Sequence, residues 1–467
     1  MKARECCGLV GICSDSSVSR KLLFGLKVIQ HRGQEAAGMA VSDGTRTRWH
    51  KDAGLVHEVF DEDILDELEG NVGIAHVRYS TTGMKTADEA HPIMAKTTKG
   101  DIAVCHNGEL TNAEALRDHF RKKGAGLEGL SDTEFIVRIL AGELESSTDP
   151  TRAISRTLGK LRGAYSLAIL IGDRLFAVRD PHGIRPLCLG KMKDGHVIAS
   201  ETPVLDLLDA ELVRDLKPGE IVEVGANVAK SYQIPTPRHT AHCMFEYVYF
   251  SRPDNCLDGQ LVYDVRRRIG EILAVESQTE ADAVFPVPDS GRAHAAGYAD
   301  GSVIPMAEGL IKNRFVERTF ILPEQREREL SVLLKLNPVK SLVEEKRVVV
   351  VDDSIIRGTT MRKIVQILKK AGAKEVHVRI GCPPVRHPCY LGIDMKTREQ
   401  FVADEKDEKQ IAKEIGADSL AFISLEGLVE AIGHPMDDLC CGCLIGEYPV
   451  PIEGERVRHQ ETLKKFY

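Results

Sequence analysis

A cysteine followed by a glycine stands close to the start of the chain, at Cys7 and Gly8. A cysteine that is the first residue of a mature chain carries its own base, because a free α-amino group titrates at about pH 7.7–8.0 and can accept the thiol proton. The resulting thiolate can attack a carbonyl carbon. This chemistry requires removal of residues 1–6. Taken alone, a Cys-Gly pair is better interpreted as the opening of an apolar strand.

A second segment with possible chemistry is 347–360, where a run of valines leads into two aspartates, a glycine and hydroxyl residues. The valine run predicts a buried strand that delivers Asp352 and Asp353 to its C-terminal end. The following loop can point backbone amides and the hydroxyls of Thr359 and Thr360 at a phosphate, at the start of a helix. The aspartates suit ribose hydroxyls, with Mg²⁺ on the same face offsetting charge. The alternative is a strand-end turn with two solvated aspartates.

Twelve cysteines need an explanation, because disulfides are disfavoured in a reducing cytosol. Thiolates gathered from distant segments suit Zn²⁺ or an iron–sulfur cluster. The locally convincing pair is Cys440 and Cys443, in a Cys-x-x-Cys pattern, whereas Cys243 and Cys389 could be buried thiols. Neighbouring cysteines that could replace a member of this set are Cys382 and Cys441. Plain burial is expected for Cys13, Cys105, Cys188 and Cys256.

Length and composition limit the classes of protein. The 467 residues suggest about two to four domains. The net charge of -8, from 62 basic and 70 acidic residues, gives no global basic field that would recruit nucleic acid. No apolar run approaches the roughly 18–20 residues that span a bilayer, and no apolar segment of a secretory signal follows the first residues. We therefore expect a cytoplasmic protein without a membrane or nucleic-acid partner.

The pattern of predicted elements changes at the proline-containing segment 231–239, where we place a domain boundary between residues 232 and 233. Before it, short strand-like runs alternate with turns and helical patterns, which predicts an α+β domain over 7–232. After it, strands alternate with helices, which predicts a mostly parallel α/β sheet within 233–467. The expected strands are 72–76, 101–105, 166–171, 175–178, 283–286, 347–351 and 376–380, and the expected helices are 132–144, 261–278 and 359–371.

Several blocks in the first half carry a family resemblance. They are 31–38, 73–83, 105–110 and 131–134. Together with the Cys-Gly-x-x-Gly start, they resemble the glutaminase domain of the N-terminal-nucleophile amidotransferases over roughly residues 7–230. The resemblance implies an αββα fold, Cys7 as the nucleophile, and residues 1–6 as a propeptide that is removed.

The resemblance also implies roles for particular residues. Arg78 matches the residue that binds the α-carboxylate of glutamine, Asp132 the one that binds its α-ammonium, and Arg32 is a further glutamine-binding residue. The Asn107 side chain and the Gly108 amide match the donors of the oxyanion hole. The alternatives are a helix N-cap at Asp132 and a simple turn at Asn107-Gly108.

The second half resembles the type I phosphoribosyltransferases in three segments, 286–291, 309–320 and 347–360. No Walker A sequence and no Gly-x-Gly-x-x-Gly after a strand is present, so ATP and dinucleotide binding lack support. The resemblance implies that Mg²⁺ is bound near Ser290, Asp352 and Asp353. It implies that phosphoribosyl pyrophosphate is bound by Asp352, Asp353, Ser354, Arg357, Gly358, Thr359, Thr360, Lys312 and Arg314.

Both halves together resemble the amidophosphoribosyltransferase family over nearly the whole chain. The implied reaction uses glutamine and phosphoribosyl pyrophosphate to make 5-phosphoribosylamine, glutamate and pyrophosphate, the first step of de novo purine synthesis, with ammonia passing internally between the sites. Purine nucleotide inhibitors and a homotetramer follow from the same analogy. One branch of the family combines a cleaved propeptide with a [4Fe-4S] cluster, whose ligands here would be Cys243, Cys389, Cys440 and Cys443.

The chain departs from the family pattern at Arg292, Glu317 and Leu333, which puts rate and coupling between sites in doubt more than reaction class. A rival enzyme is the hexosamine-forming amidotransferase, which would lack the 347–360 segment. A rival of another class is a non-catalytic regulatory protein that binds phosphoribosyl pyrophosphate or nucleotides. Such a sensor has no use for an acyl-transfer site around Cys7.

Overall fold

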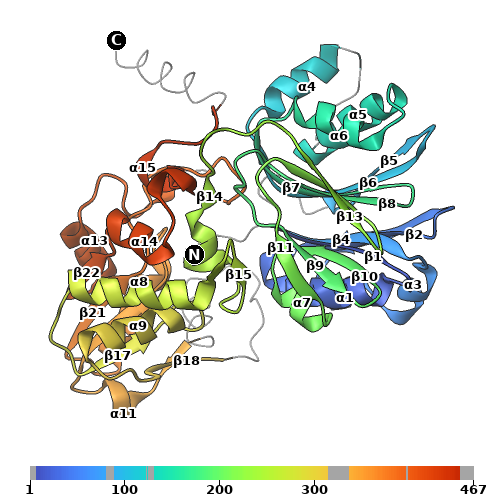
Figure 1. Ribbon diagram of the computed structural model, residues 1–467. Helices are drawn as coiled ribbons and strands as arrows, with labels where there is room; N and C mark the ends of the chain where they lie inside the picture. Colours follow the sequence, from blue (N-terminus) through green and yellow to red (C-terminus); the bar gives the residue numbers. More distant parts are fainter. Residues whose placement is uncertain are drawn as a thin grey trace, which may run out of the picture.

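The computed structural model of the protein describes residues 7–79, 89–122, 124, 131–313, 336–395 and 398–452. Residues 1–6, Arg314, Glu317 and Leu333 lie outside the described residues. Figure 1 shows two lobes, one built from the first half of the chain and one from the second. In the part of the chain that the structure describes, no helix is both long enough and apolar enough to cross a membrane.

The first half contains two antiparallel sheets that lie face to face (Figure 1). The first sheet has the order β11-β9-β10-β1-β4-β2-β3. Its strands are β1 (Gly8–Ser14), β2 (Ala36–Ser42), β3 (Thr47–Ala53), β4 (Val72–Arg78), β9 (Cys188–Met192), β10 (Gly195–Ala199) and β11 (Glu211–Asp215). The second sheet has the order β13-β12-β8-β7-β6-β5. Its strands are β5 (Ile93–Thr97), β6 (Gly100–Leu110), β7 (Gly163–Ile171), β8 (Arg174–Arg179), β12 (Glu220–Val224) and β13 (Ala229–Gln233).

Helices cover the outer face of each sheet, which gives the four layers of an αββα sandwich (Figure 1). Beside the first sheet lie α1 (Ser19–Val28), the 3₁₀ turn η1 (Gln30–Arg32), α2 (Val56–Val59), α3 (Glu62–Glu67) and α7 (Pro203–Leu207). Beside the second lie α4 (Ala113–Lys122), α5 (Asp132–Glu145) and α6 (Pro150–Leu158). Separate apolar clusters fill the space between the sheets and the space under each helical layer. The sheets are thus buried on both faces, which fixes the strand ends that carry the predicted site.

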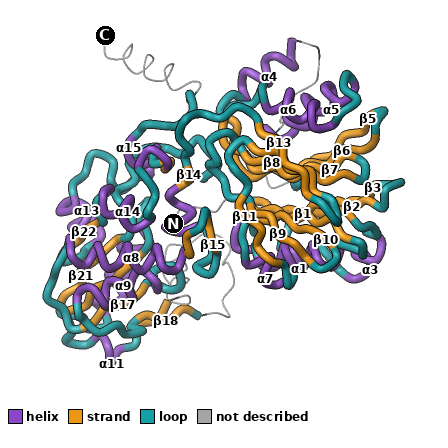
Figure 2. Tube along the Cα trace, in the orientation of Figure 1, coloured by secondary structure: helices purple, strands orange, loops and turns teal. Residues whose placement is uncertain are grey.

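The second half is built on a four-stranded parallel sheet with the order β17-β20-β21-β22. Its strands are β17 (Ala283–Pro286), β20 (Arg347–Asp352), β21 (Glu375–Ile380) and β22 (Ser419–Phe422). Val348 to Val351 are completely buried, as expected for a parallel strand covered on both faces. Figure 2 shows helices on the flanks of this sheet. They include α8 (Val262–Glu276), α9 (Arg292–Ser302), α12 (Thr359–Lys370), α13 (Glu408–Ile415) and α14 (Leu425–Ile432).

Shorter elements join the halves and close the second one. They are β14 (His242–Cys243), the π-helical turn η3 (Glu246–Phe250), β15 (Cys256–Leu257), β16 (Gln260–Leu261), β18 (Leu310–Lys312), β19 (Leu336–Pro338), α11 (Lys340–Val343), η4 (Arg398–Gln400), η5 (Met436–Asp438), β23 (Leu439–Cys440) and α15 (Gly442–Ile445).

All the helices and strands expected from the sequence are present, with ends that differ by a few residues. The largest difference is β6, which runs on to Leu110 and therefore contains Asn107 and Gly108 within the strand.

Candidate active sites

Cys7 lies immediately before β1, where the strand enters the first sheet. Its Sγ donates to the carbonyl of Tyr79, 3.6 Å away at the end of β4. Burial raises the pKa of the Cys7 thiol, and the guanidinium of Arg78 offsets part of that effect. The thiol is therefore neutral near pH 7 unless a nearby base accepts its proton.

The two residues predicted to bind the charged ends of glutamine lie near Cys7, since both Arg78 and Asp132 act on the pKa of its thiol. Arg78 is nearly buried at the end of β4, and its Nη2 pairs with Oε2 of Glu89 at 2.6 Å. The Asp132 carboxylate accepts a hydrogen bond from the backbone N–H of Leu110 at 3.0 Å. Burial opposes ionisation of Asp132, but His106 and these hydrogen bonds outweigh it and lower the pKa. An ionised Asp132 can receive an ammonium group.

The predicted oxyanion donors lie inside β6 rather than in a turn. Asn107 is completely buried, and neither its amide nitrogen nor its amide oxygen has a hydrogen-bond partner among the described residues. Buried amides are almost always hydrogen-bonded. A buried amide without a protein partner is therefore what we expect of a group whose partner is a bound ligand. Gly108 has φ of +142°, and a Cβ there would lie 2.1 Å from the carbonyl oxygen of Ala164. Only glycine fits this position.

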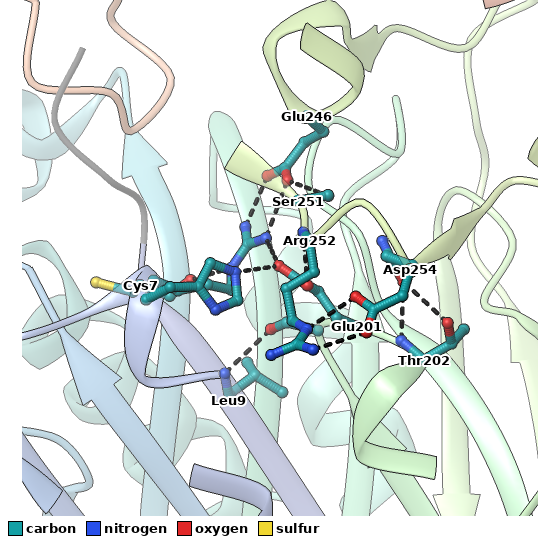
Figure 3. Close-up of polar contacts among 12 residues, drawn as sticks. Cys7, Leu9, Glu201, Thr202, Glu246, Ser251, Arg252 and Asp254 are labelled. Carbon is teal, nitrogen blue, oxygen red and sulfur yellow. Dashed lines mark hydrogen bonds and ion pairs between the residues drawn. The ribbon is translucent and has the colours of Figure 1, made fainter. Parts of the chain in front are cut away.

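Arg32 contacts the backbone of Cys7 and two buried carboxylates, those of Glu201 and Glu246, which Figure 3 labels. Its Nε donates to the carbonyl oxygen of Cys7 at 3.1 Å. Its Nη1 pairs with Glu201 at 2.6 Å, and its Nη2 pairs with Glu246 at 2.7 Å. All three of these charged side chains are buried. The prediction that Arg32 contacts glutamine stays a prediction, while its hydrogen bond from Nε places it against the backbone of Cys7.

Sequence reasoning missed Glu201 and Glu246. Burial opposes ionisation of Glu201, yet His31 and Arg32 lower its pKa to about 2. Glu246 is the one charged residue between Met244 and Phe250, and a carboxylate inside such an apolar stretch requires a buried partner. That signal was available in the sequence, but it could not name Arg32 as the partner.

The phosphoribosyl segment folds as expected. Asp352 is the last residue of β20, and Asp353 and Ser354 follow it; all three are buried, with the Ser354 hydroxyl donating to Asp353 at 2.8 Å. Gly358 has φ of +69° and is the N-cap of α12. Thr359 and Thr360 form the first turn of that helix, where the positive end of the helix dipole favours an anion.

The loop after β17 lies beside this segment, because Pro286 pairs with Val351 in the parallel sheet. It carries Ser290, and its Asp289 forms an ion pair of 2.7 Å with Lys312 at the end of β18. The structure thus brings Lys312 and Ser290 to the sheet edge that carries Asp352. Arg314 lies outside the described residues.

Two of the four predicted cluster ligands are paired by the backbone, since Cys243 of β14 and Cys440 of β23 are register partners. Burial and the neighbouring thiols raise the pKa values of Cys440 and Cys443 well above the ordinary range. Burial raises that of Cys243 to about 11, and burial also raises that of Cys389. Among the described residues, no group of three or more histidine, cysteine, aspartate or glutamate side chains is spaced to hold a metal ion.

Comparisons with known proteins agree with this division of the chain. A family model described as a glutamine amidotransferase domain matches residues 76–206, and one described as a phosphoribosyl transferase domain matches residues 255–394. A relative named amidophosphoribosyltransferase from Methanocaldococcus jannaschii is 50% identical, over 97% of this chain and 100% of its own length. The chain belongs to the amidophosphoribosyltransferase family. The amidophosphoribosyltransferase of Bacillus subtilis is 42% identical, over 97% of this chain and 96% of its own.

Solved structures extend the likeness to the fold. The glutamine phosphoribosylpyrophosphate amidotransferase of B. subtilis, complexed with ADP and GMP, matches with a TM-score of 0.90 and 40% identity, over 96% of this chain and 98% of that one. A structure described as the allosteric regulatory enzyme of purine biosynthesis matches with a TM-score of 0.91 and 41% identity, over 96% and 97% of the two chains. The fold class predicted from the sequence is therefore confirmed as that of the amidophosphoribosyltransferase family.

Proposed function

We propose that the protein catalyses the glutamine-dependent amination of 5-phosphoribosyl 1-diphosphate, which yields 5-phosphoribosylamine, glutamate and pyrophosphate and opens de novo purine biosynthesis. The observation that carries the proposal is that Arg78 and Asp132 lie near Cys7, while Asp132 accepts from the end of β6, the strand that carries the buried amide of Asn107. A chain of this family that only sensed phosphoribosyl pyrophosphate would have no use for those residues.

In the glutaminase half, Arg78 and Asp132 would bind the α-carboxylate and α-ammonium of glutamine. The Cys7 thiolate attacks the side-chain amide carbon, ammonia leaves, and water hydrolyses the thioester to glutamate. Negative charge on the carbonyl oxygen would be stabilised by the unpaired amide of Asn107 and the backbone N–H of Gly108.

The base for this reaction is proposed to be the α-amino group of Cys7. While residues 1–6 are attached, that nitrogen is an amide and cannot accept a proton. Burial raises the pKa of the Cys7 thiol, so the thiol depends on such a base. We therefore propose that the active chain begins at Cys7.

In the second half, the first turn of α12 with Thr359 and Thr360 would hold the 5-phosphate, and Asp352 and Asp353 the ribose hydroxyls. Mg²⁺ usually binds one or two carboxylates together with substrate phosphates, so the absence of a preformed three-ligand site among the described residues fits this ion. Ser290, Asp352 and Asp353 would hold it, where it would neutralise charge on the leaving pyrophosphate. Lys312 would add a cation on the same side.

Ammonia made at Cys7 is proposed to reach the phosphoribosyl carbon inside the protein. Free ammonia is mostly protonated near neutral pH, and an ammonium ion has no lone pair with which to displace pyrophosphate. The purine nucleotides ADP and GMP, present with the B. subtilis relative, are proposed as inhibitors of this chain too. A homotetramer and a cytoplasmic location are proposed by analogy with the family.

Cys243, Cys389, Cys440 and Cys443 are proposed to hold a [4Fe-4S] cluster with a structural role. A cluster is larger than a single ion, so its cysteine ligands stand farther apart than those of one metal. The donor set fits, because all four are thiols, and Cys243, Cys389 and Cys440 each act on the pKa of Cys443. Backbone N–H groups also point at the sulfur of Cys389, for example that of Leu391 at 3.4 Å, which favours a thiolate.

The test measures pyrophosphate release from phosphoribosyl pyrophosphate and Mg²⁺ with either glutamine or ammonium. We expect glutamine to support release in the wild type but not in Cys7→Ala, and ammonium to support it in both. Cys13→Ala is the matched control, because Cys13 lies on the same strand without a role in the site. The intact mass of the active wild type should correspond to a chain that begins at Cys7. If neither glutamine nor ammonium supports pyrophosphate release in the wild type, the alternative of a non-catalytic regulatory protein is favoured instead.

A further inference from the structure

Glu246 belongs to the second half of the chain but lies between two buried arginines of the first half. Its carboxylate accepts from Nη2 of Arg32 at 2.7 Å and from Nη1 of the same residue at 3.0 Å. The same carboxylate pairs with Nη1 of Arg185 at 3.4 Å. The side chains of all three residues are about 1% exposed. Such a cluster is stable only while its charges compensate one another.

Each of these arginines reaches a different side of the glutaminase site. Arg32 donates from Nε to the carbonyl oxygen of Cys7. Arg185 donates from Nε and Nη2 to the carbonyl oxygen of Leu391, at 3.1 and 2.7 Å. The next residue, Gly392, packs on the oxyanion strand so closely that a Cβ there would lie 2.9 Å from the carbonyl carbon of Gly108. One carboxylate therefore connects the backbone of the nucleophile with the backbone that covers the oxyanion donor.

The position of Glu246 is itself fixed from within the second half. The hydroxyl of Ser251 donates to its Oε2 at 2.8 Å, as Figure 3 shows. Arg266 donates to the carbonyls at both ends of this turn, those of Tyr247 at 2.8 Å and Ser251 at 2.7 Å. Burial lowers the pKa of Arg266 to about 10, and the negative charge of Asp353, in the phosphoribosyl loop, offsets part of that effect. The carboxylate is thus held by the element that packs against the second site.

Resting on the proposed function, we propose that Glu246 is a positioning residue for the glutaminase reaction. Through Arg32 and Arg185 it fixes the backbone on both sides of the amide that Cys7 attacks. Glu246 does not touch the substrate, and its effect is geometric. A displacement of about 1 Å in a reacting group can lower a rate by about a hundredfold, so a small shift at Cys7 would be visible in the kinetics.

The test variant is Glu246→Gln, which keeps the shape of the side chain and removes its charge. We expect the glutamine-supported kcat to fall about tenfold to a hundredfold, while the KM for glutamine and the ammonium-supported rate stay within about twofold of wild type. The rate at which a glutamine-like diazoketone alkylates Cys7 should fall by the same factor as kcat. These measurements use the processed, iron-replete protein, with both halves of the chain present.

The matched control is Asp258→Asn, another carboxylate of the second half that pairs with a buried arginine of the first half. Its partners are Arg179 at 3.0 Å and His242 at 2.9 Å, and none of them contacts Cys7 in the structure. We expect this variant to leave the ratio of glutamine-supported to ammonium-supported rate unchanged. If Glu246→Gln is insoluble, Ser251→Ala removes only the hydroxyl contact and should lower the same ratio by a smaller factor.

Two outcomes would overturn the proposal. If Glu246→Gln lowers the ammonium-supported rate as much as the glutamine-supported rate, its role is structural for the whole chain. If neither rate nor the alkylation of Cys7 changes, Glu246 does not position the nucleophile. Failure of the proposed function is a separate result, because wild type itself would then release no pyrophosphate with glutamine.

Discussion

At the scale of single residues, the chemistry of the glutaminase site depends most clearly on Asn107. A completely buried primary amide without partners is costly, by about 1–3 kcal/mol for each unmade hydrogen bond. Such a cost is retained where the group serves a ligand. The strand geometry explains the position of the amide, since β6 continues through Asn107 and holds it in the buried part of the strand.

The substitution Asn107→Ala should therefore lower the glutamine-supported kcat by about a hundredfold to a thousandfold, the loss seen when one oxyanion donor is removed. The ammonium-supported rate should stay near wild type, because the phosphoribosyl site is unaffected. Steady-state rates with both nitrogen sources measure this. The matched control is Asn112→Ala, because its amide only ties together backbone groups of Lys160 and Arg162. A similar kcat loss in both variants would contradict the role of Asn107.

The residues proposed to touch the substrate could be named from the sequence, but the residues that support them could not. Cys7, Arg78, Asn107 and Asp132 lie in short local blocks whose residue types match one reaction. The partners of Arg32 stand 169 and 214 positions away, and only the folded chain brings them together. A pattern within one segment carries no information about contacts over such separations.

At the scale of elements, the alternating strands and helices of the second half were predictable, because a valine run and an amphipathic helix each have a clear period. The cysteine segments have no such period. They are held by the short parallel pair of β14 with β23, by the first turn of α15, and by the irregular chain around Cys389. These elements are too short for a sequence pattern to define, so the choice among neighbouring cysteines stayed open.

The choice between neighbouring cysteines can be tested with one pair of variants. Cys440→Ser should lose most of the iron and sulfide bound by purified protein, together with the visible absorption of the cluster, and should unfold at a lower temperature. Cys441→Ser changes the adjacent thiol, which lies outside the proposed ligand set, and should keep both. Iron analysis, absorption spectra and thermal unfolding measure these effects. Loss of iron only in Cys441→Ser would shift the ligand set by one residue.

At the scale of the whole molecule, a second charged cluster joins the two halves. Arg179 pairs with Asp258, which also pairs with His242, and the backbone N–H of Asp258 donates to the carboxylate of Asp215 at 3.0 Å. Burial, and next the like charge of Asp258, raise the pKa of Asp215 to about 6. The carboxylates of Asp215 and Asp258 thus lie near the same cations, Arg179 and His242. Asp258 pairs with both directly, so its negative charge is better balanced than that of Asp215.

The sign of the pH dependence follows from this raised pKa. Asp215 contributes most to stability below the ordinary aspartate pKa, and that contribution is lost as the pH rises through about 6. The substitution Asp215→Asn keeps the acceptor oxygen and removes the charge. We expect it to raise the apparent midpoint of thermal unfolding at pH 7.5 by about 1 °C or more, and to give a smaller gain at pH 5.

Thermal unfolding at the two pH values measures this effect. The control is Asp66→Asn, because Asp66 is exposed and its ion pair with Arg20 contributes little at either pH. A lower midpoint for Asp215→Asn at pH 7.5 would show that its charge is needed at the interface. None of this cluster was predicted, since its members come from four separate segments.

The close packing of Gly392 on Gly108 limits how the gene can be rearranged. A glutaminase half produced alone would lose Leu391, Gly392 and Glu246 together, so that Arg185 would lose its pair with Glu246 and Arg32 would keep only Glu201. Recombination that exchanges one half for that of a distant relative would have to carry these contacts along. A break near residue 233 therefore separates two modules in sequence that buried contacts keep joined in the fold.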